Sequence, residues 1–183
     1  MCIRDSNCLV RSDAPLTHTI GYTLQGILEV GVLAGRADFL VAVRRAVDQI
    51  LPHISVSGYL PGLFYSDWEP AQFSSCLTGS AQISIVLFRL FEQTGAERYS
   101  QAGNRLVNYL KALQSVDSAL PDINGALAGS FPLFGQYMRA GYPNWATKYL
   151  LDALMLQDRL CGADDQAAPA LAIRAQSADK IPT

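Results

Sequence analysis

The sequence contains a helical pattern that repeats after about 60 residues. When the chain is shifted by this length, the aligned positions share glycine, aromatic, small or aliphatic character: Gly35 on Gly95, Phe39 on Tyr99, Ala42 on Ala102, Val47 on Val107 and Ile50 on Leu110. Each unit reads as two helices joined at a glycine, because glycine readily takes the left-handed conformation that ends a helix. A chain with this repeat is predicted to fold as a series of helical hairpins.

The spacing of apolar residues predicts five helices, at residues 17–34, 37–51, 79–94, 97–114 and 144–158. The second and fourth carry a single apolar stripe, whereas the first, third and fifth are apolar nearly all round, which predicts that neighbours enclose them. Enclosed helices that alternate with amphipathic ones are typical of an α/α toroid, with an inner and an outer ring. We therefore predict an all-α fold of antiparallel hairpins forming part of such a toroid, with a plain helical solenoid as the alternative.

Two long connections, at residues 52–78 and 115–143, separate the hairpins, and both contain a G-x-L-x-G element, GYLPG and GALAG. Since every helix reverses direction, the short turns are expected at one end of the bundle and the long connections at the other. Long connections without helices of their own are uncommon and tend to be functional. We therefore expect a site at the end of the long connections, which form the rim of the ring.

Polar residues recur on one face of each inner helix. They are His18, Tyr22, Gln25 and Glu29 on the first, Thr78, Gln82, Ile85 and Arg89 on the third, and Asn144, Lys148 and Asp152 on the fifth. One interpretation is a polar cavity wall. The other is that these groups satisfy one another between neighbouring helices, with Glu29 and Arg89 as a buried ion pair.

The long connections are rich in aromatic residues, namely Tyr59, Phe64, Tyr65, Trp68, Phe131, Phe134, Tyr137, Tyr142 and Trp145. Flat rings beside carboxylates suit a sugar, because its C–H faces stack on rings while its hydroxyls need polar partners. Asp67 and Glu69 are the candidate catalytic pair for glycoside chemistry, although SDWEP also reads as a simple turn. The candidate substrate-binding residues are His18, Tyr22, Tyr65, Trp68, Gln82, Tyr137, Asn144, Trp145 and Lys148.

The charge of the ligand can also be predicted. The N-termini of the three inner helices converge, and His18 and Lys148 add hydrogen-bond donors there. Helix N-termini attract negative charge. This arrangement favours an anionic ligand, such as a uronate or a phosphate.

Composition excludes several classes of function. The chain has 183 residues, of which 50% are hydrophobic and 16% charged, and a net charge of -2, as in a globular domain. Scattered Lys and Arg argue against a nucleic-acid partner. Four cysteines without disulfide or metal-site spacing indicate a reducing cytoplasm. No residue is assigned as a metal ligand, and no cofactor is expected. No secretion signal or membrane span is predicted, although a truncated chain could have lost a signal.

Other chemistries find weaker support. SSCLTGSAQ is similar to a helix start of lanthionine-cyclase-like toroids, but the Cys-His pair that their zinc needs is absent. Terpene-cyclase-like toroids are a further option, yet their DxDD motif is missing as well. Cys76 beside His18 is a conceivable nucleophile, while a buried cysteine at a helix start is the more common case.

Four segments carry a family resemblance: LTHTIGYTLQGILEVG, CLTGSAQISIVLFRL, GALAGSFPLFGQY and YPNWATKYLLDAL. Together they resemble the six-hairpin glycosidase-like superfamily of α/α toroids, especially uncharacterised bacterial members that accompany surface-polysaccharide genes. The resemblance covers residues 16–158. It implies a ring of six hairpins and a role on carbohydrate, and it transfers no catalytic residue.

The chain is expected to be a piece of a larger protein. MCIRDSN resembles a translated sequencing-library adapter, so we predict an artefactual or disordered leader at 1–15, a hairpin domain at 16–158 and a disordered or degraded tail at 159–183. Two and a half hairpins cannot close a ring, so the remainder of the chain or an oligomer is expected to cover the open sides. The predicted function is hydrolysis, elimination or epimerisation of a glycan, and the alternatives are a polysaccharide-binding module and a protein-interaction scaffold.

Overall fold

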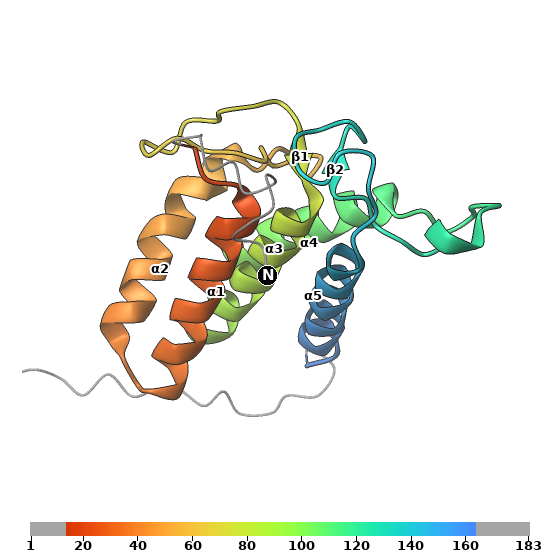
Figure 1. The fold of residues 1–183 in the computed structure, drawn as a ribbon. Coiled ribbons are helices and arrows are strands. Elements are labelled where there is room, and N and C mark those ends of the chain that lie inside the picture. The colour runs from red at the N-terminus through yellow and green to blue at the C-terminus, as the bar shows by residue number, and fades with distance from the viewer. Residues whose placement is uncertain (1–13, 164–183) are drawn as a thin grey trace, which may run out of the picture.

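A computed structural model describes residues 14–163 of the chain (Figure 1). Its elements are α1 (Thr17–Leu33), α2 (Ala37–Ile50), η1 (Leu51–His53), β1 (Ser75–Cys76), α3 (Leu77–Thr94), α4 (Glu97–Leu113), η2 (Pro121–Ile123), β2 (Ser130–Phe131) and α5 (Asn144–Ala163). The predicted all-α class and the five helices are confirmed. Most of the predicted leader and tail, residues 1–13 and 164–183, lies outside the described residues.

Three predicted helices end one residue earlier than expected, at Leu33, Ile50 and Leu113, and two boundaries differ by more. α3 begins at Leu77 rather than at residue 79, because Cys76 is its cap and the Cys76 Sγ accepts a hydrogen bond from the Gly79 amide at 3.4 Å. α5 continues beyond residue 158 to Ala163, and Leu160 in this extension packs against the core.

The helices form two antiparallel hairpins and a single further helix (Figure 1). α3 lies in the middle, packed against α1, α4 and α5, while α2 packs against α1. Both short turns contain a left-handed glycine, Gly35 with φ of 63° and Gly95 with φ of 66°. The two long connections lie at the opposite end of the helices from these turns, which is the end where α1, α3 and α5 begin.

The core surrounds α3, of which every residue from 77 to 88 is buried. One apolar cluster joins α3 to α1, α2 and α4, and includes Leu28, Val47 and Leu87. A second joins α3 to α4 and α5, and includes Phe88 and Leu150.

The predicted enclosure is confirmed for α3. It is wrong for α1 and α5, which share the apolar pattern but expose Val30 and Leu33, and Leu151 and Met155, respectively, because only α3 has helices packed on three sides among the described residues.

Two glycines bring α1 and α3 into close contact. A β-carbon on Gly79 would lie 2.6 Å from the His18 amide nitrogen, and one on Gly21 would lie 2.8 Å from the Gln82 Cβ. Neither position has room for a side chain. The N-terminal halves of α1 and α3 can therefore approach only because both residues are glycine.

The two G-x-L-x-G elements have the same structural role. Their first glycines, Gly58 and Gly125, have φ of 87° and 82°, and their leucines are fully buried. The carbonyl oxygen of the last glycine accepts a hydrogen bond from the first amide of α1 or α3: Thr17 donates to Gly62 and Leu77 donates to Gly129, each at 2.9 Å. Each element therefore satisfies a backbone donor that the helix leaves unpaired.

A short antiparallel sheet joins the two long connections. Ser75 pairs with Phe131 and Cys76 pairs with Ser130. Two residues are too few to produce an alternating pattern, so this sheet could not be predicted from the sequence.

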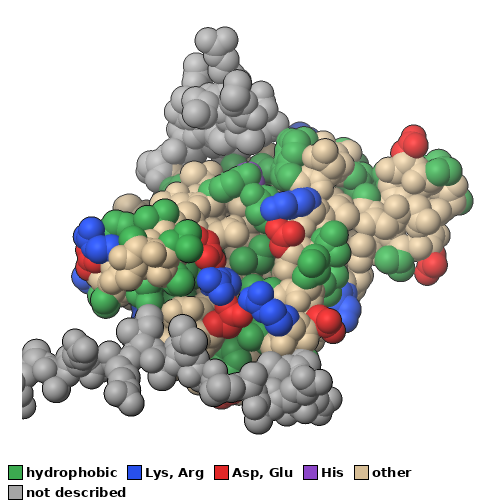
Figure 2. Space-filling view, turned by 90° about the horizontal axis from the view of Figure 1, so that it is seen from below, with side chains coloured by type: hydrophobic (Ala, Val, Ile, Leu, Met, Phe, Trp, Pro, Cys, Tyr) green, Lys and Arg blue, Asp and Glu red, His purple; other side chains and the backbone are tan. Residues whose placement is uncertain are grey.

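An ion-pair network joins α1, α3 and α5 near the end of the short turns. Arg89 donates two hydrogen bonds to the Glu29 carboxylate, from Nε at 2.8 Å and from Nη2 at 3.0 Å. Arg89 also pairs with Glu92, which in turn pairs with Arg159 on α5. The predicted Glu29–Arg89 pair is confirmed, but it is half-buried rather than buried, and Figure 2 shows acidic and basic side chains side by side on this face.

The close contact at Gly79 generates a stability prediction. Gly79→Ala should lower the free energy of unfolding by about 1–3 kcal/mol, because the new methyl group would overlap the backbone of α1. Gly26→Ala is the matched control: it lies in α1 with nothing within 4 Å of the added carbon, and should raise stability by about 0.5–1 kcal/mol. Urea unfolding followed by circular dichroism measures both changes. Equal effects at the two glycines would refute the proposed close packing.

Candidate functional site

Several predicted site residues meet at the end of the bundle where α1, α3 and α5 begin. His18 of α1 is buried, and its Nδ1 lies 2.7 Å from the Oε1 of Gln82 on α3. The imidazole also contacts two tyrosine rings, with centroid distances of 4.9 Å to Tyr22 and 5.2 Å to Tyr137. His18 is therefore the centre of a cluster drawn from two helices and a long connection.

The chemistry of His18 follows from its surroundings. Burial lowers the pKa of its imidazole, and the hydrogen bond with Gln82 opposes this shift without cancelling it. The ring is therefore neutral near pH 7. Because a carboxamide oxygen can only accept, Nδ1 carries the proton and donates to Gln82. Nε2 is left as an acceptor.

Helix α5 extends the cluster through Tyr149. The Tyr149 ring packs edge-on against Tyr22 at 5.7 Å, and the Lys148 Nζ lies 4.3 Å from the Tyr149 ring centroid. Burial raises the pKa of the Tyr149 hydroxyl, and hydrogen bonding with Tyr22 raises it further, while Gln82 nearby works in the opposite direction. Tyr149 therefore stays protonated at neutral pH and keeps a hydroxyl proton to donate.

Trp145 joins the cluster from the first turn of α5. Its Nε1 donates a hydrogen bond of 2.7 Å to the hydroxyl of Tyr137. We name the whole set the aromatic–histidine cluster: His18, Tyr22, Gln82, Tyr137, Trp145, Lys148 and Tyr149. Six of these seven are predicted binding residues. Tyr149 was missed, because in the sequence it is one apolar residue within a helix that is apolar on most sides.

Two buried polar atoms beside the cluster lack hydrogen-bond partners. They are the Nε2 of Gln82 and the Oγ1 of Thr78, one turn apart on α3, and both side chains are fully buried. Buried polar groups are nearly always paired, so such exceptions call for an explanation. Neither atom has a partner at hydrogen-bond distance among the described residues, although the Gln82 side chain still acts on the nearby Tyr149 hydroxyl and opposes the rise in its pKa.

A depression of about 400 Å³ lies next to the cluster at the start of α5. Asp122, Tyr142, Asn144 and Lys148 contribute to its lining. The predicted residue Asn144 lies here, and Lys148 is shared between the depression and the aromatic–histidine cluster. Lys148 also forms an ion pair with Asp152 at 2.6 Å.

The predicted carboxylates lie on a tight turn in the first long connection. The Tyr65 amide donates to the Glu69 carbonyl, and the Trp68 amide donates to the Tyr65 carbonyl. Asp67 accepts a hydrogen bond from the Glu69 amide at 3.1 Å, and both acidic side chains are exposed. Trp68 has φ of 70° in this turn, a conformation unusual for a large side chain.

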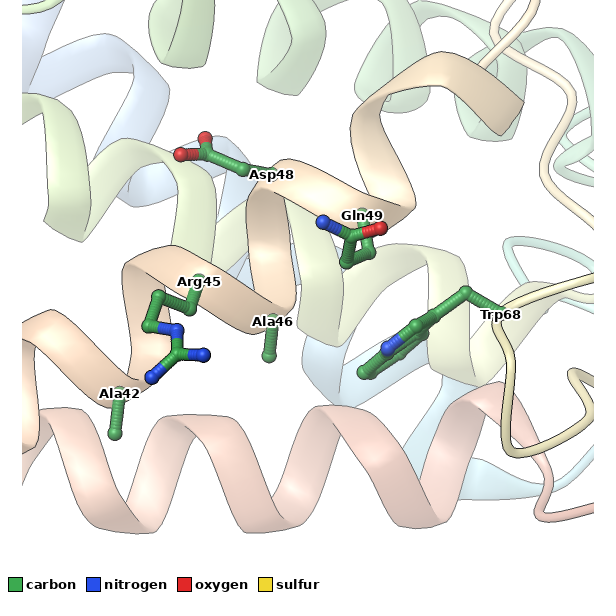
Figure 3. Close-up of a pocket in the computed structure, with 6 residues that line it drawn as sticks. All are labelled: Ala42, Arg45, Ala46, Asp48, Gln49 and Trp68. Carbon is green, nitrogen blue, oxygen red and sulfur yellow. The ribbon is translucent and has the colours of Figure 1, made fainter.

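Trp68 closes one end of a groove of about 590 Å³ beside α2 (Figure 3). Its indole points along the groove, where Arg45 and Gln49 contribute polar atoms. Asp48 also borders the groove, but its carboxylate points away (Figure 3) and accepts hydrogen bonds from Arg98 and Tyr99.

The turn and the aromatic–histidine cluster lie on different faces of α1. A second depression beside Trp68, of about 250 Å³, is lined by Thr19, Ile20 and Thr23. At 100° per residue, these positions are well separated from His18 and Tyr22 around the helix. The structure therefore brings six predicted site residues together and places Tyr65, Asp67, Trp68 and Glu69 elsewhere.

Cys76 is unsuited to nucleophilic chemistry. Its side chain is fully buried, and burial raises the pKa of its thiol to about 12. The thiolate, which is the reactive form, is therefore scarce at neutral pH. Cys76 acts instead as the cap of α3.

Comparisons with known proteins identify no relative: no protein-family model, curated protein or solved structure matches this chain. Within residues 14–163, no three His, Cys, Asp or Glu side chains are grouped closely enough to hold a metal ion. Over the same range, no helix combines the length and the apolar character needed to cross a membrane.

The contrast between two cysteines generates a reactivity prediction. In the native protein, iodoacetamide should modify Cys161, which is exposed, and leave Cys76 unmodified. In denaturant both should react. Peptide mass spectrometry after a short pulse of reagent at pH 7.5 distinguishes the two sites. Rapid native modification of Cys76 would show that its thiol is accessible and would restore it as a candidate nucleophile.

Proposed function

We propose that this chain binds a glycan at the aromatic–histidine cluster and belongs to a carbohydrate-active α/α-toroid protein. One observation carries the proposal: α1, α3, α5 and a long connection together supply one group of side chains, which contains aromatic rings, an imidazole and an amide. Tyrosine rings beside polar groups are suited to a sugar, which presents C–H faces and hydroxyls together.

The cluster offers defined contacts to a sugar. Tyr22 is the most accessible ring, with 52% of its surface exposed, and provides the stacking surface. His18 provides an acceptor at Nε2, while the unpaired Nε2 of Gln82 provides a donor. Small rearrangements of Tyr22 would open these buried groups to a sugar hydroxyl.

An acidic sugar is the favoured ligand. Lys148 is exposed beside the cluster, and three helix N-termini, which carry partial positive charge, begin at this end. The preference for a uronate over a neutral sugar is expected to be modest, because Lys148 already pairs with Asp152 and screening by salt weakens exposed charges.

The toroid part of the proposal rests on the alternation of helix types. α1, α3 and α5 are the inner helices, and the amphipathic α2 and α4 cover them from outside. Two and a half hairpins form an arc of such a ring. Further hairpins would add helices beside α1, α3 and α5, which carry most of the aromatic–histidine cluster.

Glycan binding can be tested with oligogalacturonate as the acidic probe. Tyr22→Ala should weaken its binding about tenfold, the size of one lost ring contact, as measured by isothermal titration calorimetry. Phe73→Ala is the matched control, since this aromatic residue of the first long connection is 96% exposed, and it should leave the affinity unchanged. A neutral cello-oligosaccharide should bind more weakly than oligogalacturonate. Failure of both probes to bind would overturn the proposal in favour of an interaction scaffold.

Catalysis by Asp67 and Glu69 is a separate part of the proposal. If they divide acid and base roles on the glycan, then Asp67→Asn and Glu69→Gln should each reduce turnover of oligogalacturonate at least a hundredfold. Affinity and the melting temperature should stay unchanged, because both side chains are exposed. Turnover is followed by release of reducing ends.

Non-catalytic polysaccharide binding is the second candidate function. It is favoured by the position of Asp67 and Glu69, which lie on another face of α1 from the aromatic–histidine cluster. Binding without turnover in the unmodified chain, weakened by Tyr22→Ala and indifferent to both carboxylate changes, would select this function over an enzyme.

A further inference from the structure

Helix α5 exposes a stripe of residues that no other described element covers. Asn144, Lys148, Leu151, Met155 and Asp158 are exposed along one face of the helix, while the exposed Arg159 beside them is paired with Glu92 of α3. Spacings of four and three residues alternate along this face, as at the contact positions of paired helices. Leu151 is 56% exposed and Met155 is 64% exposed. We name these five positions the α5 stripe.

The equivalent positions are covered in the other inner helices. When the first residues of α1, α3 and α5 are aligned, Leu151 corresponds to Leu24 and Ser84, and Met155 corresponds to Leu28 and Phe88. All four of these counterparts are buried.

Helices cover these counterparts in both complete hairpins. Leu24 and Leu28 pack in one cluster with Val43 and Val47 of α2, and the Phe88 ring lies against Gly103 of α4. The fold therefore places a helix over this face wherever the hairpin is complete. On α5 the same face is free among the described residues.

We propose that a second copy of this chain covers the α5 stripe, with the two α5 helices packed antiparallel about a twofold axis. The charges of the stripe carry this choice. Lys148 and Asp158 lie equally far from residue 153, on opposite sides of the apolar pair. An antiparallel partner therefore places Lys148 against the partner's Asp158 and Leu151 against the partner's Met155.

A parallel arrangement is disfavoured by the same charges. In a parallel pair, Lys148 of one chain would face Lys148 of the other, and the two Asp158 residues would face each other. Like charges in contact are destabilising. The antiparallel pair places a lysine opposite an aspartate at both ends of the contact. Both chains also contribute the same surface, as in most homodimers.

The dimer is expected to be weak. Only one face of one helix from each chain takes part, which places the contact at the low end of specific interfaces. Lys148 is already paired with Asp152, so the added ion pairs contribute more to orientation than to affinity. We expect a dissociation constant on the order of micromolar or above.

Sedimentation velocity of the full 183-residue chain between about 1 and 500 µM tests the proposal. The unmodified chain should shift from monomer to dimer over this range. Leu151→Asp should abolish the dimer, because it places a carboxylate in the apolar centre. Leu33→Asp, the same change at a residue of α1 that is 86% exposed, is the matched control and should dimerise normally.

Charge exchange tests the antiparallel register. Lys148→Glu alone and Asp158→Lys alone should each weaken the dimer at least fivefold, and the double variant should regain it. Circular dichroism melting shows whether each variant is folded before it is compared. A chain that is monomeric at every concentration, or a dimer that survives Leu151→Asp, would overturn the proposal. A double variant that stays monomeric would overturn the antiparallel register.

Discussion

The rest of the structure depends on the burial of α3 between three other helices. A helix enclosed in this way must satisfy its polar side chains inside the protein, since unpaired buried groups are costly. Ser80 and Ser84 bond to backbone carbonyl oxygens of the preceding turn, and Gln82 bonds to His18. The hydrogen bond that solves this structural problem therefore also holds the imidazole of the candidate site.

The close approach of α1 and α3 gives this arrangement its geometry. Gly21 and Gly79 leave no space between the two helices, so His18 and Gln82 meet at hydrogen-bond distance. The G-x-L-x-G elements then pair the first amides of both helices with carbonyl oxygens. Each long connection is thus joined to the start of an inner helix, which places the aromatic residues of the connections beside the helical ones.

The two ends of α1, α3 and α5 consequently differ in chemistry. At the short turns, Arg89 and Glu92 link the three helices through charges that neutralise one another. At the long connections, neutral rings, an imidazole and an amide lie together, and the side chains of Thr78 and Gln82 each leave a buried polar atom unpaired. This difference places the candidate ligand site at one end only.

The sequence by itself determined the helices, the turns at Gly35 and Gly95 and the faces that carry His18 and Gln82, because periodicity and glycine conformation are local properties of the chain. Only the tertiary structure decided that Tyr149 belongs to the cluster, that Asp67 and Glu69 lie beside another face of α1, and that no other described element covers the α5 stripe. Contacts between distant segments depend on how closely helices approach and on the path of the loops. Neither quantity is encoded in the spacing of residues along one helix.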